Sequence, residues 1–205
     1  MKYIELEKNL EKIKIFSTND LKFLDEKYNK SKIFNWKKLG YIKQIIRGFY
    51  ILGKIEINHF LSFKIANKIY SPSYISLESV FSYYGIIPEQ SFVIKSVSTK
   101  KTNTFHTDFG TYEYNKIKTK MYFGYEIKII KNEKILIASL EKALIDYFYL
   151  NNNINSTIDL QYLRFNKYLL KEKLDINLLK KYGKSISSKV VNKRIDLLIE
   201  YINND

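Results

Sequence analysis

The hydrophobic pattern of the chain changes abruptly near Ser91, and this change constrains the fold more than any other feature. Upstream of it, apolar residues recur mostly at helical spacing, apart from a hairpin at residues 42–52. Downstream, four segments rich in Val, Ile, Tyr and Phe show the alternation that is typical of strands: SFVIKSVST, GTYEYNKI, MYFGYEIKII and EKILIAS. A helix with a strong apolar face follows at Ala138 to Leu150, and residues 160–204 predict two or three more helices. The pattern predicts an α+β domain with a central β-sheet and C-terminal helices.

The first 55 residues predict a different arrangement of three helices and a hairpin. Apolar spacing indicates helices over 3–15, after Ser17 or Thr18, and after Ser31, where hydroxyl side chains can cap the helix N-termini. The residues expected to face inward on the second and third helices are Leu21, Leu24, Ile33, Trp36 and Leu39. Gly40 is expected to end the third helix, and residues 42–52 read as two strands that turn near Arg47.

This order of elements is typical of a winged helix-turn-helix. We therefore expect two domains. Residues 1–55 are predicted to be a winged helix-turn-helix DNA-binding domain, and residues 56–205 an α+β domain with a helical tail. No repeat or long linker separates them.

The charge of the chain points to an anionic partner, nucleic acid first. The 205 residues carry a formal net charge of +14. Residues 1–55 contain 13 Lys and Arg against 6 Asp and Glu, so this quarter of the chain holds a net +7, half of the excess. A competing explanation is that the chain is rich in Lys, Ile, Asn and Tyr. A+T-rich coding DNA produces such a composition without any binding role for lysine.

Several compositional features bear on the compartment and on possible sites. The chain has no cysteine, which excludes disulfides, thiolate nucleophiles and cysteine-ligated metals. The N-terminal segment MKYIELEKNLEKIKIF lacks the continuous apolar stretch of a signal peptide, and no window approaches the roughly 18 apolar residues that a membrane span needs. We expect a cytoplasmic protein with no membrane contact.

Candidate catalytic and metal sites are weak. His106 and Asp108 could form a metal pair in a loop between strands, but two ligands define no site. Ser76 and Ser79 lack the G-x-S-x-G elbow of a serine hydrolase, and Ser76 is expected to cap a helix instead.

The remaining patterns also lack an active site. Glu141 and Asp146, five residues apart on one helix, do not share a face, so salt-bridged structural roles are expected. No phosphate-binding glycine pattern occurs. We expect no enzymatic activity, no cofactor and no bound metal.

The basic residues of the N-terminal module are the strongest candidate site. On the third helix, Lys32, Asn35, Lys37 and Lys38 avoid the apolar positions and would face solvent or a DNA major groove. Lys43, Gln44 and Arg47 lie on the hairpin, where a wing would contact phosphates or the minor groove. Asparagine can bond adenine in two places, and lysine contacts guanine or phosphate. The alternative is a solvated basic surface without a ligand.

Four segments together resemble the AbiEi family, the antitoxins of type IV toxin–antitoxin systems. In chain order they are FSTNDLKFL, LGYIKQIIRGFYIL, SPSYISLESVFSYYGIIPEQ and LIASLEKALIDYFYL. The likeness spans roughly residues 15 to 150 and fades after about residue 155. The second segment is similar to the family's wing. The third, which holds both prolines of the chain, is similar to the entry into the family's C-terminal domain.

The resemblance implies a transcriptional repressor that also acts as an antitoxin in abortive infection, a form of phage defence. Its winged helix would bind double-stranded DNA at inverted repeats upstream of its own operon. The family's DNA-reading positions map onto the helix around Lys32 to Lys38 and the wing around Lys43 to Arg47. The C-terminal domain would counteract an AbiEii-like nucleotidyltransferase toxin, with which it need not form a stable complex. No heptad pattern is visible, so we expect a monomer in solution that pairs on DNA.

Two other functions stay open at this level. The chain could be a stand-alone transcriptional regulator, or a protein-interaction module without a toxin partner, whose basic N-terminus is only solvated. An RNA-binding or nucleotide-transfer enzyme is a weaker third idea, because the sequence shows no paired carboxylates at a suitable spacing.

Overall fold

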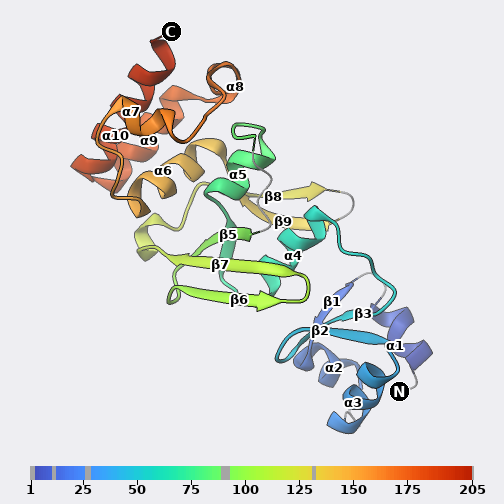
Figure 1. Cartoon of the computed structure of the whole chain (residues 1–205). Coiled ribbons are helices and arrows are strands. Elements are labelled where there is room, and N and C mark those ends of the chain that lie inside the picture. The colour runs from blue at the N-terminus through green and yellow to red at the C-terminus, as the bar shows by residue number, and fades with distance from the viewer. Residues whose placement is uncertain (1–2, 11–12, 26–28, 89–92, 131–132, 205) are drawn as a thin grey trace.

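The computed structural model describes residues 3–10, 13–25, 29–88, 93–130 and 133–204, and it is an α+β fold with two separate sheets. Figure 1 shows a small N-terminal module, a central mixed sheet and a cluster of C-terminal helices at the far end from the N-terminus. The α+β class expected from the pattern of periodicities is therefore confirmed.

The described residues of the N-terminal module form the elements α1 (Tyr3–Leu10), β1 (Ile15–Ser17), α2 (Thr18–Leu24), α3 (Lys30–Lys38), β2 (Ile42–Ile46) and β3 (Phe49–Leu52). The strands form an antiparallel sheet in the order β1-β3-β2. Helix α1 is described over Tyr3–Leu10; residues 11–12 of the helix expected over 3–15 lie outside the described residues, and Ile15, expected to be its last residue, begins β1. The β2–β3 hairpin turns at Arg47 and Gly48, as expected.

The sheet of this module is apolar on both faces. Neighbouring residues alternate between two cores, as side chains on a strand must. Phe16 and Tyr50 belong to a core shared with the three helices, whereas Ile15, Ile45 and Ile51 belong to the large core of the rest of the chain. The N-terminal module is therefore seated on the larger part through a buried apolar face.

The larger part holds a six-stranded mixed sheet in the order β6-β7-β5-β4-β9-β8. Its strands are β4 (Ser73–Ile75), β5 (Val93–Ser98), β6 (Asn103–Thr107), β7 (Gly110–Lys116), β8 (Tyr125–Ile130) and β9 (Glu133–Ala138). The pairs β5–β7 and β4–β9 are parallel and the other pairs antiparallel. Helices α4 (His59–Ile69) and α5 (Glu78–Tyr83) accompany the sheet. Ser91, where the pattern changes, lies outside the described residues.

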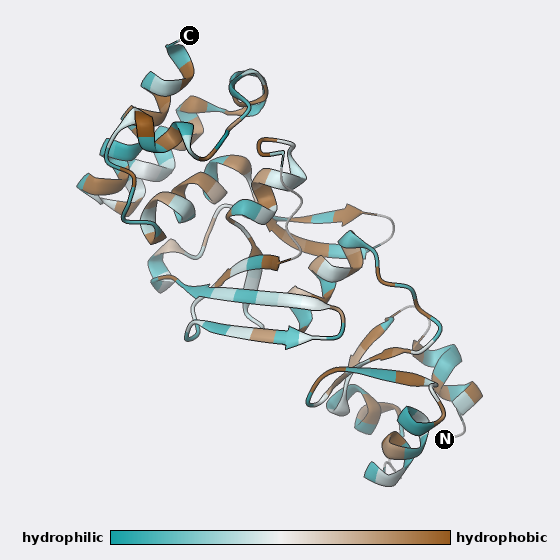
Figure 2. Ribbon diagram, in the orientation of Figure 1, coloured by the Kyte–Doolittle hydropathy of each residue, from teal (hydrophilic) through white to brown (hydrophobic). Residues whose placement is uncertain are grey.

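Five helices complete the chain: α6 (Leu140–Leu150), α7 (Thr157–Gln161), α8 (Lys167–Lys173), α9 (Ile176–Ile186) and α10 (Lys189–Asn203). Helix α6 is buried along most of its length and packs against α9 and α10. The buried Arg194 of α10 donates to the carbonyl oxygens of Phe148 and Ile154, which ties the helical tail to the end of α6. Figure 2 shows the resulting alternation of hydrophobic and hydrophilic bands along these helices.

Two local expectations were wrong, and one strand was missed. Ser76 does not cap a helix: α5 begins two residues later, and Ser76 is fully buried. His106 lies within strand β6 and not in a loop. Strand β4 was missed because three buried residues between turns give no alternation to detect.

Candidate nucleic-acid interface

Helix α3 is held so that one face is buried and the other exposed. Asn29 caps it by accepting from the backbone N–H of Ser31 at 2.9 Å, in the place where Ser31 was expected to be the cap. Ile33 and Trp36 are buried in the core of the module. Leu39 was expected inward but is 62% exposed, because it lies at the end of the helix, past the last core contact.

The predicted contact residues are placed mostly on the surface. Asn35, Lys37 and Lys38 are exposed on α3, and Lys43 and Arg47 are exposed on the hairpin. Their exposure is required for contact with a nucleic acid, and it also fits a solvated basic surface.

Lys32 differs from the other lysines of α3. Its ammonium group lies 3.0 Å from the carboxylate of Asp25, just beyond the end of α2. The hydrogen bond to Asp25 raises the pKa of Lys32. The charge of Lys32 is thus already paired within the protein, so it is a weaker candidate for phosphate than Lys37 or Lys38.

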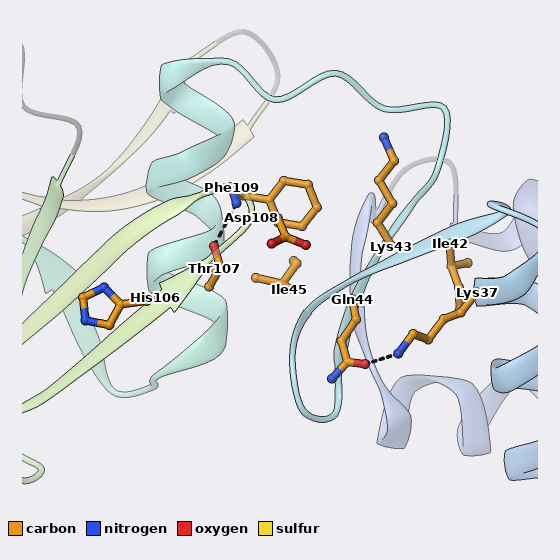
Figure 3. A pocket seen from close by; sticks show the side chains of 9 residues that line it. All are labelled: Lys37, Ile42, Lys43, Gln44, Ile45, His106, Thr107, Asp108 and Phe109. Atoms are coloured by element: carbon orange, nitrogen blue, oxygen red, sulfur yellow. Dashed lines mark hydrogen bonds between the residues drawn. The ribbon is translucent and has the colours of Figure 1, made fainter.

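A hydrogen bond joins the helix to the hairpin. The ammonium group of Lys37 donates to the side-chain carbonyl of Gln44 on β2. This bond links α3 to the hairpin at the protein surface. Figure 3 shows the two side chains meeting across the space between the elements.

A groove between α3 and the hairpin turn gathers positive charge. It has a volume of about 400 Å³, and its lining includes Lys30, Lys37 and Arg47 around the aromatic ring of Phe34. Phe34 is 68% exposed. Lys30 and Phe34 were not among the residues predicted from the sequence. The exposure of Phe34 could have been inferred, because Phe34 directly follows the inward-facing Ile33 and a narrow apolar face of a helix does not bury two successive residues.

The hairpin turn is anchored. The carbonyl oxygen of Gly48 accepts from the backbone N–H of Thr18 at 3.0 Å, so the turn is tied to the start of α2. At the other end, Gly53 lies so close to Gly40 that a Cβ there would overlap the Gly40 carbonyl oxygen. The hairpin is a fixed part of the surface with respect to α3.

A second pocket, of about 670 Å³, lies between the two parts of the chain (Figure 3). The β2–β3 hairpin contributes Lys43 and Gln44 to it; His106 comes from the end of strand β6, and Asp108 from the turn between β6 and β7. The carboxylate of Asp108 would repel a phosphate, so this pocket fits an anion less well than the groove beside Arg47. The side chains of His106 and Asp108 point in different directions (Figure 3), and the described residues contain no group of three His, Asp or Glu that could hold a metal ion.

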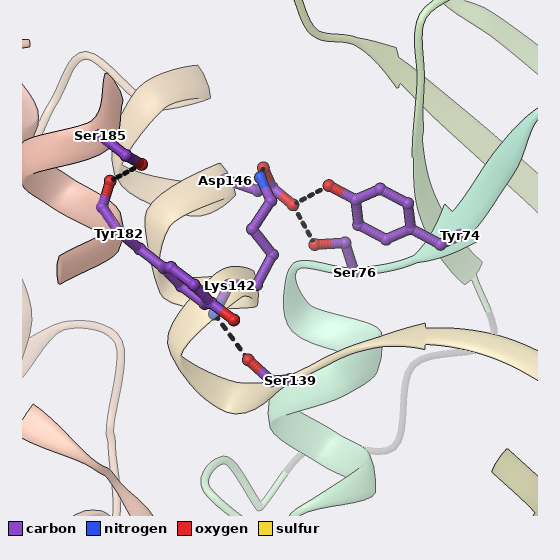
Figure 4. A network of polar contacts seen from close by, with 7 residues as sticks. All are labelled: Tyr74, Ser76, Ser139, Lys142, Asp146, Tyr182 and Ser185. Carbon is purple, nitrogen blue, oxygen red and sulfur yellow. Dashed lines mark hydrogen bonds and ion pairs between the residues drawn. The ribbon is translucent and has the colours of Figure 1, made fainter. Parts of the chain in front are cut away.

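The serines considered as nucleophiles have structural roles. Ser76 donates to the buried carboxylate of Asp146 at 2.9 Å, and Tyr74 donates to the same oxygen at 2.9 Å. The other oxygen of Asp146 accepts from the fully buried Lys142. Figure 4 shows these groups converging on Asp146 from α6 and from the segment that begins with β4. Ser79 accepts from the backbone N–H of Lys95 at 2.8 Å, so it joins α5 to β5.

Burial governs the protonation of this cluster. It lowers the pKa of Lys142 and raises that of Asp146, while the ion pair between them opposes both shifts. Burial also raises the pKa of Tyr74. All three side chains are sealed from solvent, which gives a substrate no access. The expected salt-bridged role of Asp146 is confirmed, and Glu141 accepts from the backbone N–H of Asp175.

The comparisons with known proteins assign no family. No model of a protein family matches the sequence, and no curated protein matches it. Among the described residues, none of the helices has both the length and the apolar character needed to cross a membrane.

Proposed function

We propose that residues 1–55 form a winged helix-turn-helix that binds double-stranded DNA, with α3 as the recognition helix and the β2–β3 hairpin as the wing. The observation that carries the proposal is the groove in which Lys30, Lys37 and Arg47 gather from the two elements. The contact between α3 and β2 supports it, because it holds the hairpin beside the helix that precedes it.

The exposed residues divide into two kinds of contact. Lys37, Lys38 and Arg47 suit phosphate oxygens, which provide affinity without sequence preference. Asn35 and Phe34 suit base edges, since an amide can bond adenine in two places and an apolar ring can contact a thymine methyl group. Sequence preference would therefore depend on the central turn of α3.

The regulatory role rests on the resemblance to AbiEi. In this role the protein represses its own operon by binding inverted repeats, and it opposes a nucleotidyltransferase-like toxin as the antitoxin of a type IV system. Each half of an inverted repeat would take one copy. The larger α+β part, with its central sheet and helical tail, would carry the antitoxin activity.

A salt series of DNA-binding measurements tests the DNA half of this proposal. The full-length protein is titrated onto its own upstream DNA and onto a scrambled duplex, with fluorescence anisotropy as the readout. We expect selective binding that weakens steeply with salt, because each neutralised phosphate releases counterions. Changing both Lys37 and Lys38 to Ala should weaken binding and reduce the slope of log K against log salt by about 1.8 for two phosphate contacts.

The matched control changes the exposed Lys171 and Lys180 of the helical tail to Ala, which removes the same net charge elsewhere. It should leave the slope unchanged. Equal effects of the two double variants, or binding without preference for the upstream DNA at every salt concentration, would reduce the basic face to a solvated surface. The hypothesis that the chain is a protein-interaction module would then replace the hypothesis that it is a repressor.

A further inference from the structure

Strand β8 forms one edge of the six-stranded sheet, and it pairs with β9 alone among the strands of the described chain. Its free side carries backbone N–H and C=O groups that can pair with another strand. Figure 1 shows β8 at the margin of the sheet, on the opposite edge from β6.

The free backbone groups belong to every second residue. The carbonyl oxygen of Gly124 accepts from the backbone N–H of Ser139 at 3.0 Å, in continuation of the β8–β9 register. Backbone groups of successive residues point to opposite sides of a strand, so those of the even-numbered residues point to β9. The backbone groups of Tyr125, Ile127 and Ile129 therefore point outward, away from the sheet.

The same three residues present an unusual apolar surface. Ile127 is 66% exposed, Ile129 is 69% exposed, and Tyr125 is also exposed. Natural edge strands are normally protected by charges, proline or a covering element. The charged residues of β8, Glu126 and Lys128, lie on the other face, where the ammonium group of Lys128 contacts Glu126 at 3.0 Å and the hydroxyl of Tyr84 at 2.8 Å. The outward edge of β8 thus combines free backbone groups with exposed isoleucines.

The order of residues along β8 is complementary to itself. If a second copy of β8 lies antiparallel with Ile127 opposite its own symmetry mate, Glu126 faces Lys128 of the other copy, and Tyr125 faces Ile129. Opposite charges and aromatic–aliphatic pairs directly across a sheet are both favourable. In a hydrogen-bonded antiparallel pair, each residue donates its N–H to the C=O of the other. The backbone N–H and C=O of Ile127 both point outward, so Ile127 can form such a pair with Ile127 of the second copy.

The neighbouring symmetric registers are unfavourable. A pairing centred on Glu126 places two carboxylates opposite each other, and one centred on Lys128 places two ammonium groups opposite each other. Like charges directly across a sheet destabilise it. The charge pattern therefore selects the register centred on Ile127.

We propose that two copies of this chain associate through β8, edge to edge and antiparallel about Ile127, so that their two sheets become one continuous sheet. The interface is the same patch on both copies, as a two-fold axis requires. This inference does not depend on DNA binding, and it revises the expectation of a monomer in solution.

Charge exchange tests the proposal. Sedimentation velocity of the full-length protein across a range of concentrations should show a monomer–dimer equilibrium. Glu126→Lys places lysines opposite one another, and Lys128→Glu places glutamates opposite one another, so each single variant should weaken dimerisation at least tenfold. The double exchange restores opposite charges across the axis and should recover most of the affinity.

A second pair of variants separates the interface from folding. Ile127→Lys should abolish the dimer and leave the far-UV circular dichroism spectrum unchanged, because the side chain is exposed. Ile158→Lys changes an isoleucine of similar exposure, 58%, on α7, and should leave the dimer intact. A wild-type protein that stays monomeric at all concentrations, or a double charge exchange that dimerises no better than the single variants, would overturn the proposal.

Discussion

At the scale of single residues, the complete burial of the ion pair on α6 goes beyond the salt-bridged role that the sequence predicts for Asp146. Lys142 and Asp146 are both completely inaccessible to solvent, and Tyr74 and Ser76 complete the hydrogen bonds of the carboxylate. The contact between Lys142 and Asp146 can be predicted from the sequence, because residues four apart on a helix lie on the same face. That Tyr74 also takes part could not be foreseen, since 72 residues separate it from Asp146 and only the folded sheet brings them together.

Removing one charge of this pair should lower the free energy of unfolding more than expected from removing both charges together. Lys142→Met leaves the carboxylate without its cation, and Asp146→Leu leaves a buried ammonium, so each should lower the free energy of unfolding by about 3–5 kcal/mol. The double variant Lys142→Met, Asp146→Leu removes both charges and should lose clearly less than the sum of the singles. Chemical denaturation measures all four proteins. A strictly additive double variant would mean that the two groups are not coupled.

At the scale of elements, the sequence predicts best where a local signal decides. Ser17 and Asp20 cap α2 reciprocally, as hydroxyl and acidic residues at a helix start indicate, and the β2–β3 hairpin turns where a glycine follows Arg47. Strands β1 and β4 could not be predicted, since each has three residues and exists only through pairing with distant strands. In the candidate interface, the exposed cations were predictable, but the pairing of Lys32 with Asp25 was not.

One glycine determines how the hairpin meets the end of α3. The backbone N–H of Gly53 donates to the carbonyl of Tyr41 at 2.7 Å, and no room remains for a Cβ beside Gly40. Gly53→Ala should push the two segments apart and lower the free energy of unfolding by about 1–3 kcal/mol. Because the hairpin would move relative to α3, DNA affinity should fall as well. Thermal unfolding and anisotropy check the two effects, and an unchanged melting temperature would contradict the close approach.

An acidic residue joins the N-terminal module to the sheet. Glu133 of β9 is buried, with Lys14 and Lys64 on its two carboxylate oxygens. Burial raises the pKa of Glu133, but the two lysines outweigh it and hold the pKa below its ordinary value. A carboxyl group with a lowered pKa in the folded state stabilises the protein above its unfolded pKa, and this stabilisation is lost as the pH falls through the folded value.

Acidification should therefore distinguish Glu133 from a surface carboxylate. Between about pH 5 and pH 3, the wild type should lose more of its unfolding free energy than Glu133→Gln, which has no charge to lose. The exposed Glu172→Gln serves as the matched control and should follow the wild type. Melting temperatures across this pH range provide the measurement. Parallel curves for the wild type and Glu133→Gln would show that the carboxylate does not hold the two parts together.

At the scale of the whole molecule, the division into residues 1–55 and 56–205 describes the order of elements along the chain better than it describes the packing. Alternate residues of β1, β2 and β3 enter two different cores. The sequence cannot predict this division between two cores, because an apolar residue in a short strand has the same character whichever core it joins. The N-terminal module consequently shares a buried apolar face with the larger part of the chain.

We therefore expect the two parts to unfold together. Trp36, the only tryptophan of the chain, lies in the core of the N-terminal module, so its fluorescence reports that module alone. Circular dichroism reports the helices of the whole chain. The two transitions should coincide in the wild type and stay coincident in Ile51→Ala, which removes a fully buried side chain from the shared face. That variant should lower the midpoint through a loss of about 2–5 kcal/mol. If the module were seated independently, the tryptophan signal would change at a lower denaturant concentration than the circular dichroism, and Ile51→Ala would shift the tryptophan transition alone.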